Sequence, residues 1–310
     1  MSPSIGANLL IKGLLNKDVE IISLSTYFAA TKWKGNDRKT KICVTKAIKK
    51  RIFIGSTKEA SSACSYLKEV IKEIGVICTI LPSALAAEGR SITTYVHPPL
   101  FLNKIALTDI FFGEGPQKSM YKLYPEGPIT PMVMSNLLSV WKEITGFLQS
   151  FDIKRFNLLK FLNDDNYPVP EEMLSRTSIE DFMNVDRIKQ EYLLYVRYTA
   201  LLIDPFSKPD QEGRYFEFSR VPLERVKRVE GRWEIPRVPL EDYKKLKLMS
   251  ELAYRVNQEL PVVNELVENF EEVVSLFSEK HRLHFDMDVF QKQLDRDLTT
   301  ILNHTQPIQT

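Results

Sequence analysis

The chain has 310 residues, of which 44% are hydrophobic and 26% charged, and its formal net charge is +2. Such a chain forms one large or two moderate globular domains with an adequate core, so it needs no disulfide or structural metal. No apolar stretch approaches the ~20 residues that a membrane span requires, and the N-terminus lacks a secretion-signal pattern. We therefore expect a cytoplasmic protein with no membrane partner.

The three cysteines are odd in number and have no metal-ligand spacing. Cys43 and Cys78 lie in apolar runs, which predicts reduced, buried thiols. Lys and Arg are in excess over the first 80 residues and Asp and Glu over the remainder. The basic excess favours a phosphate-bearing ligand, but solvated surface lysines would explain it as well.

The first 80 residues alternate strand and helix patterns. An amphipathic stretch at 5–15 suits a short helix, and apolar runs at 19–25, 51–54 and 76–81 suit strands. Between the last two runs, a helix should begin at Ser56 or Thr57 and end near Ile74. This order predicts the edge of an α/β sheet.

Beyond Pro82 the pattern becomes helical. Helices are predicted at 131–151, 186–203, 240–260, 261–278 and 286–303. Residues 204–239 are rich in Pro and Gly and could hold one hairpin. We expect a partial α/β domain over residues 1–82 and a mostly helical domain over residues 83–310.

A glycine-rich G-x-G-x-x-G turn, which normally follows the first strand of a dinucleotide-binding domain, is absent. The chain is therefore expected to start in the middle of such a fold, with only the later half of the sheet.

The segment TYVHPPLFLN, residues 94–103, places His97 before two prolines. Proline fixes its own φ and restricts its predecessor, so the direction of the imidazole is set in advance. Histidine also titrates near neutrality, as a proton donor and acceptor requires. A histidine that only fills a helix junction remains an open alternative.

Three segments together carry a family resemblance: TYVHPPLFLN, YKLYPEGPIT (121–130) and EYLLYVRYTALLIDPFSKPD (191–210). In order and spacing they resemble the opine dehydrogenase family, in its metallophore-making, staphylopine dehydrogenase branch. The resemblance runs from residue 1 to about 260. It implies an α/β part followed by an all-α part, that is, a partial Rossmann-type sheet and a helical catalytic domain.

The resemblance also implies a reaction. An amine built from histidine condenses with an α-keto acid, pyruvate or 2-oxoglutarate, and NADPH reduces the imine to a metal-chelating opine. It implies a homodimer joined through the helical domain. Metal would belong to the product, which agrees with a sequence that shows no ligand cluster; His281 and His284 lack a convincing third ligand.

In such an enzyme His97 would be the general acid and base, paired with a carboxylate that orients it. Asp204 is the candidate partner, because it follows an apolar helix; an ordinary turn with Pro205 is the alternative. Arg197, in a largely apolar helix, would bind a substrate carboxylate or form an internal ion pair.

Further candidates are weaker. Tyr124 and Glu126 could reach the substrate amine, or could serve packing and capping. Ser25 and Thr26 could contact the nicotinamide half at the carboxyl edge of the sheet, or could cap a loop.

Two other functions remain open. The chain could be a non-catalytic remnant that only dimerises or binds. It could also be an unrelated helical protein that binds nucleic acid through the basic run 46–51, although this run has no interleaved aromatic residues to stack on bases.

Overall fold

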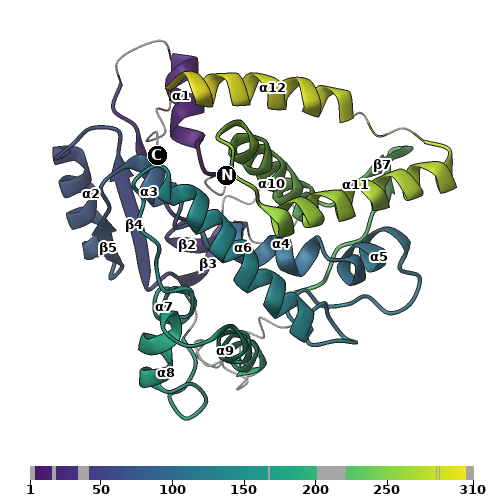
Figure 1. The fold of residues 1–310 in the computed structure, drawn as a ribbon, viewed down its shortest axis with the longest axis horizontal. Coiled ribbons are helices and arrows are strands. Elements are labelled where there is room, and N and C mark those ends of the chain that lie inside the picture. Colours follow the sequence, from purple (N-terminus) through teal and green to yellow (C-terminus); the bar gives the residue numbers. More distant parts are fainter. Residues whose placement is uncertain are drawn as a thin grey trace. The chain divides into compact units, whose positions relative to one another are not determined.

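The computed structural model of the chain describes residues 4–15, 19–33, 42–166, 168–200, 221–283, 285 and 287–304. The chain divides into two compact units. The first comprises residues 1–92 and 160–168, and the second comprises residues 93–159 and 169–310. Figure 1 labels most of their helices and strands.

The first unit contains a three-stranded sheet in the order β1 (Ile22–Leu24), β4 (Arg51–Ser56), β5 (Ile77–Ile80). Strand β5 runs parallel to β4, joined through α2 (Ser62–Glu73), whereas β1 runs antiparallel to β4. The sheet confirms the three predicted apolar runs as strands. Its core consists of buried side chains from β4, α2, β5 and the residue before β5: Ile52, Ile54, Cys64, Ile71, Val76 and Cys78.

Two local predictions for this unit were wrong. Cys43 is exposed, because it begins β3 (Cys43–Ile48), which pairs with β2 (Ala29–Trp33) in a hairpin that the sequence pattern did not predict. Helix α2 begins at Ser62 and is capped by Ser61, whose hydroxyl accepts a hydrogen bond from the Cys64 amide at 3.0 Å. Ser56 instead ends β4.

The first unit extends past Pro82 to residue 92, because α3 (Ala84–Glu88) packs on β1 and β4. Glu88, at the end of α3, ties it to the start of the chain. This fully buried carboxylate accepts hydrogen bonds from the amides of Gly6 and Asn8, the Asn8 side chain and the Ser23 hydroxyl, at 2.7 to 3.0 Å. Gly6 and Asn8 lie at the start of α1 (Ala7–Leu15), so the carboxylate satisfies amides that a helix N-terminus leaves unpaired.

The second unit is helical. Its elements are α4 (Ile92–Phe101), α5 (Lys104–Phe112), α6 (Pro131–Gln149), α7 (Leu158–Asp164, which continues into the first unit), α8 (Arg176–Glu180), η1 (Asp181–Met183), α9 (Arg187–Ala200), the hairpin β6 (Lys227–Val229) and β7 (Arg232–Glu234), α10 (Arg237–Arg255), α11 (Pro261–His281) and α12 (Met287–His304). Four of the long helices, α6, α10, α11 and α12, confirm the predicted ones, and α9 does so as far as residue 200.

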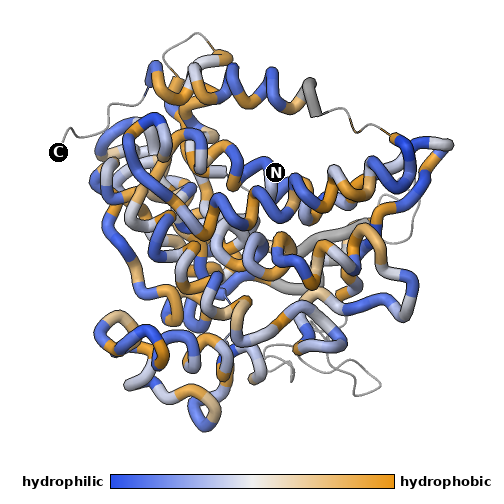
Figure 2. The backbone as a smooth tube through the Cα atoms, turned by 45° about the vertical axis from the view of Figure 1, so that its right-hand side comes forward, coloured by the Kyte–Doolittle hydropathy of each residue, from blue (hydrophilic) through white to orange (hydrophobic). Residues whose placement is uncertain are grey.

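Side-chain pattern explains how these helices pack. Figure 2 shows orange and blue residues alternating along α11 and α12, as expected for helices with one apolar face. Helix α11 packs on α5, α6 and α10, and its Phe270 and Phe277 rings both contact the ring of Phe111 on α5. These contacts form a core on which α10 is held.

Helix α10 has a break that matters for the site. Val238 has φ −99° and ψ 111°, outside the helical region, because Pro239 disfavours the helical conformation of the residue before it. The regular helix therefore starts at Pro239, and its next inward-facing position is Asp242, which is buried.

Candidate functional site

His97 lies at the centre of a polar cluster inside the second unit. Its Nδ1 atom is 3.3 Å from Oδ2 of Asp242, and its Nε2 atom is 3.4 Å from the hydroxyl oxygen of Tyr121. The imidazole is 19% exposed and the Asp242 side chain only 2%. Both ring nitrogens thus have a polar neighbour, in a place that solvent reaches only in part.

The backbone and packing around His97 explain why the ring is held in place. Pro98 and Pro99 follow it within α4 and are buried. One turn after His97, Phe101 presents its ring edge-on to the imidazole at 5.2 Å and to the ring of Tyr121 at 5.9 Å. A fixed imidazole is what a general acid or base needs, because its proton must point at the reacting atom.

Asp242 is a buried carboxylate with two cationic or potentially cationic neighbours. Its Oδ2 atom faces His97 at ion-pair distance but makes no hydrogen bond to any residue that the structure describes. On its other side, Nζ of Lys245 is 4.0 Å from Oδ1, and the Lys245 side chain is 11% exposed. A buried carboxylate is costly without such partners.

Tyr121 is positioned by a tight loop over residues 119–130. The amide of Ser119 donates to the Glu126 carbonyl at 2.9 Å, and the amide of Tyr124 donates to the Ile129 carbonyl at 3.0 Å. A Cβ on Gly127 would lie 2.3 Å from the Lys122 carbonyl oxygen, so only glycine fits there. The loop thereby presents Tyr121 to His97.

The same loop places the other two predicted residues elsewhere. The Tyr124 side chain is 60% exposed. Glu126 pairs with Lys122 at 2.8 Å, and this hydrogen bond lowers the pKa of the Glu126 carboxyl. The described contacts bring neither of them to His97, so their roles toward a substrate remain predictions.

Arg197 is buried in α9, where its guanidinium carbon lies 5.2 Å from the centre of the adjacent Tyr198 ring. Burial raises the pKa of Tyr198 to about 12, while the positive charge of Arg197 acts in the opposite direction. Asp204, the predicted partner of His97, lies outside the described residues. The carboxylate that the structure does place beside His97 is Asp242.

The geometric argument for Ser25 and Thr26 does not hold. Because β1 is antiparallel to β4, it runs away from the carboxyl ends of β4 and β5 and leaves Ser25 beside Phe53 in the middle of β4. Ser25 exchanges backbone and side-chain hydrogen bonds with Phe53 at 2.9 and 3.1 Å, which uses its hydroxyl in the sheet.

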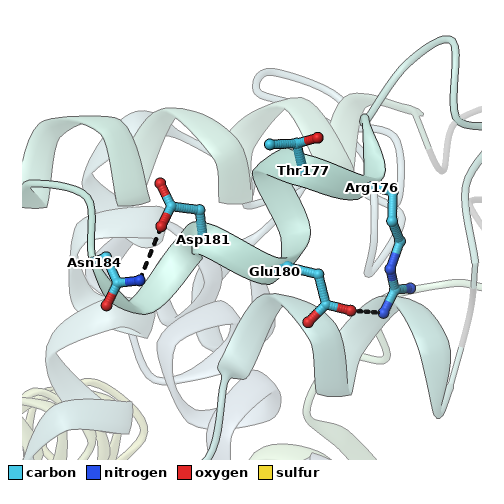
Figure 3. Close-up of a pocket in the computed structure, with 5 residues that line it drawn as sticks. All are labelled: Arg176, Thr177, Glu180, Asp181 and Asn184. Atoms are coloured by element: carbon cyan, nitrogen blue, oxygen red, sulfur yellow. Dashed lines mark hydrogen bonds and ion pairs between the residues drawn. The ribbon is translucent and has the colours of Figure 1, made fainter.

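A surface hollow of about 530 Å³ near α8 offers little chemistry. It is lined by Arg176, Thr177, Glu180, Asp181 and Asn184. Figure 3 shows that four of these residues are already paired, Arg176 with Glu180 and Asn184 with Asp181. Across the described ranges no group of three or more His, Cys, Asp or Glu residues could hold a metal ion. In the same ranges, no helix is both long and apolar enough to span a membrane.

Comparison with known proteins identifies the fold and the family of the chain. Two octopine dehydrogenase structures superpose with TM-scores of 0.55 and 0.52, at 13% and 12% identity, over 87% and 88% of the chain and 60% and 61% of theirs. At that identity they define the fold alone, which is the opine dehydrogenase fold. Residues 1–305 match the family described as staphylopine dehydrogenase, and the chain belongs to that family.

The chain is similar to pseudopaline synthase of Pseudomonas aeruginosa, with 45% identity over 89% of this chain and 64% of the relative. It is 36% identical to staphylopine synthase of Staphylococcus aureus, over 91% of this chain and 66% of that protein. A structure of yersinopine dehydrogenase with NADP+ bound superposes with a TM-score of 0.85 at 34% identity, over 97% of this chain and 70% of the other. The chain thus spans slightly less than two thirds of the two curated relatives' length.

The sequence pointed to His97 but not to Asp242, Tyr121 or Lys245, which the structure places around it. One signal for Asp242 was available. The buried residues Pro239, Asp242, Leu246, Met249 and Ala253 follow helical spacing, so the aspartate interrupts an apolar stripe. No comparable signal marks Tyr121, whose contact with His97 depends on the fold of its loop.

Proposed function

We propose that this protein is an NADPH-dependent opine dehydrogenase that makes a staphylopine-like metallophore. It joins a histidine-derived amine to an α-keto acid, pyruvate or 2-oxoglutarate, by reductive condensation. The observation that carries the proposal is the partly enclosed His97–Asp242 pair, in a chain of the staphylopine dehydrogenase family. Three similar proteins are named pseudopaline synthase, staphylopine synthase and yersinopine synthase, and these names support the same class of product.

The pair can supply the acid–base chemistry of condensation. The amine adds to the keto carbonyl to give a carbinolamine, and protonation of its hydroxyl group releases water and leaves an iminium ion. His97 is the proton donor for this step and the acceptor for the amine proton that is lost earlier. Asp242 stabilises the imidazolium form and orients the ring through Nδ1, so that Nε2 is the reacting nitrogen.

NADPH, when bound, supplies the hydride that reduces the iminium carbon. The carboxyl ends of β4 and β5 fit a dinucleotide, since ligands of open α/β sheets bind at that edge. The exposed Lys58 follows β4 at that edge, and its ammonium group suits phosphate oxygens. Arg197 remains the candidate for a substrate carboxylate. We further propose that the enzyme is cytoplasmic and forms a homodimer.

A binding-only remnant is the competing function. It would not need a buried carboxylate held against a proline-fixed imidazole, an arrangement that costs stability. That cost is understandable if the pair performs chemistry.

Activity decides between the two. The protein is incubated with NADPH, the amine and each keto acid, while NADPH absorbance and the mass of the product are followed. We expect NADPH consumption matched by a secondary amine product, and a fall of about 10²-fold to 10⁴-fold in turnover for His97→Gln. Product formation that survives in His97→Gln would contradict the assigned site, and no product from the unaltered protein would contradict the function.

A further inference from the structure

The hydroxyl group of Tyr121 lies next to Nε2 of His97, the imidazole nitrogen that does not face Asp242. Since Nδ1 faces Asp242, the nitrogen left for substrate is Nε2, and the polar contact that the structure gives this atom is the Tyr121 hydroxyl at 3.4 Å. Phe101 packs edge-on against both rings and keeps them together. A substrate atom that exchanges a proton with Nε2 therefore meets the phenol at the same place.

The phenol has the chemistry for this position. A tyrosine hydroxyl donates one hydrogen bond and accepts others, so it can donate to the neutral ring and accept from the charged one. Rotation of the hydroxyl group about its C–O bond is enough to switch between donating and accepting, so the packing of the ring does not change.

We propose that Tyr121 is a proton relay between His97 Nε2 and the substrate. This inference rests on the function proposed above. In the dehydration step, the hydroxyl proton of Tyr121 passes to the carbinolamine oxygen as the carbon–oxygen bond breaks. The imidazolium proton of His97 passes from Nε2 to the phenol oxygen. Water leaves, the iminium ion carries the positive charge, His97 becomes neutral, and Tyr121 ends the step unchanged.

The charged neighbours of His97 are compatible with such a relay. Asp242 faces the ring from α10 on the Nδ1 side, with Nζ of Lys245 4.0 Å from its other oxygen, and Tyr121 faces the ring from the loop on the Nε2 side. The ammonium of Lys245 partly offsets the negative charge of Asp242.

The test is Tyr121→Phe, which removes the hydroxyl and keeps the ring that packs on Phe101. Tyr254→Phe is the control, because Tyr254 is exposed and lies on α10 well beyond Asp242. For Tyr121→Phe we expect kcat to fall by about 10-fold to 100-fold, with KM for both substrates within about twofold and an unchanged melting temperature. The pH profile of kcat should change shape, whereas Tyr254→Phe should behave like the unaltered protein.

A second measurement follows the histidine directly. The chain has 4 histidines, so the imidazole signals of His97 can be assigned in nuclear magnetic resonance spectra by comparison with His97→Gln. We expect Tyr121→Phe to move the Nε2 chemical shift of His97, without moving the signals of His281 or His304.

The outcomes separate the relay from the proposed function. Normal kcat and pH profile in Tyr121→Phe, with His97→Gln inactive, would overturn the relay and leave the function standing. Changed His97 signals with unchanged turnover would also overturn it, since the phenol would then only contact the ring. No product from the unaltered protein would overturn both.

Discussion

Oδ2 of Asp242, on α10, lies 3.3 Å from Nδ1 of His97, on α4. The carboxylate is buried, and its second oxygen faces Lys245. The carboxylate of Asp242 thus lies between an imidazole and an ammonium group. Replacing each of the three residues should change turnover or the pH optimum in a different way.

Replacing Asp242 by asparagine keeps the shape of the side chain and removes its charge. Turnover should fall by about 10-fold to 10⁴-fold, because the imidazolium loses its stabilising partner and the ring can adopt the wrong tautomer. The pH optimum should move down, since the positively charged ring is less favoured. Steady-state rates across pH measure both effects.

Asp204→Asn serves as the comparison for Asp242→Asn, because Asp204 was the partner expected from sequence. If Asp204→Asn shows the larger loss and the shifted optimum, the pairing with Asp242 does not represent the working enzyme.

Lys245→Met should move the pH optimum in the other direction. The methionine keeps most of the stem volume, but the charge of Asp242 then acts on the imidazolium without compensation. Lys244→Met is the matched control on the adjacent, exposed position. Equal pH profiles for the two variants would show that Lys245 has no influence on His97.

Gly127→Ala should disturb Tyr121 without touching it. The added Cβ would lie 2.3 Å from the Lys122 carbonyl, so the loop over residues 119–130 must move. We expect a lower kcat and little change in the melting temperature. Gly115→Ala, whose Cβ meets nothing within 4 Å, should be silent. A fully active Gly127→Ala variant would show that catalysis does not depend on the position of the loop.

Glu88→Gln should destabilise the first unit. Each oxygen of Glu88 accepts two hydrogen bonds, so the amide group of glutamine would face two donors whichever way it turns. Leaving buried donors unsatisfied costs about 1–3 kcal/mol each. Denaturant unfolding measures the loss, and Glu69→Gln, on the exposed face of α2, is the control. A Glu88→Gln variant as stable as the control would mean that the four bonds contribute little.

Lys142 gives a pH-dependent prediction. Burial, followed by the charges of Arg187 and Arg155, lowers the pKa of its ammonium from the ordinary value of 10.5. The charged form is therefore less favourable in the folded state. This cost is fully present below the folded pKa and disappears as pH rises toward 10.5.

Lys142→Met should accordingly melt higher than the unaltered protein at neutral pH, by on the order of 1 °C. The difference should shrink as the pH approaches the ordinary lysine value. A difference that stays constant with pH would place its cause in packing and not in charge.

The sequence predicted those features that depend on neighbouring residues. Strand runs, the spacing of the long helices and the constrained backbone at His97 are all local, and the structure contains them. The hairpin β2–β3 escaped prediction because its strands carry no clear alternation, and Cys43 was misjudged with it.

Contacts between distant elements could not be predicted in the same way. Asp204 was expected as the partner of His97 because it follows an apolar helix, whereas Asp242 lies inside α10 and reaches His97 only through the packing of that helix. The direction of β1 was another such case. A strand pattern does not reveal whether the strand runs parallel or antiparallel to its neighbour, and that direction decides whether Ser25 lies near the carboxyl ends of β4 and β5.

His97, Tyr121 and Asp242 all belong to the second compact unit. The groups proposed to transfer protons therefore all come from one unit. Any related protein that keeps α4, the loop over residues 119–130 and α10 also keeps these groups. Under the proposed function, selection can remodel the first unit without rebuilding these proton-transfer groups. A change of the proposed keto acid or amine would then require substitutions around groups that themselves stay constant.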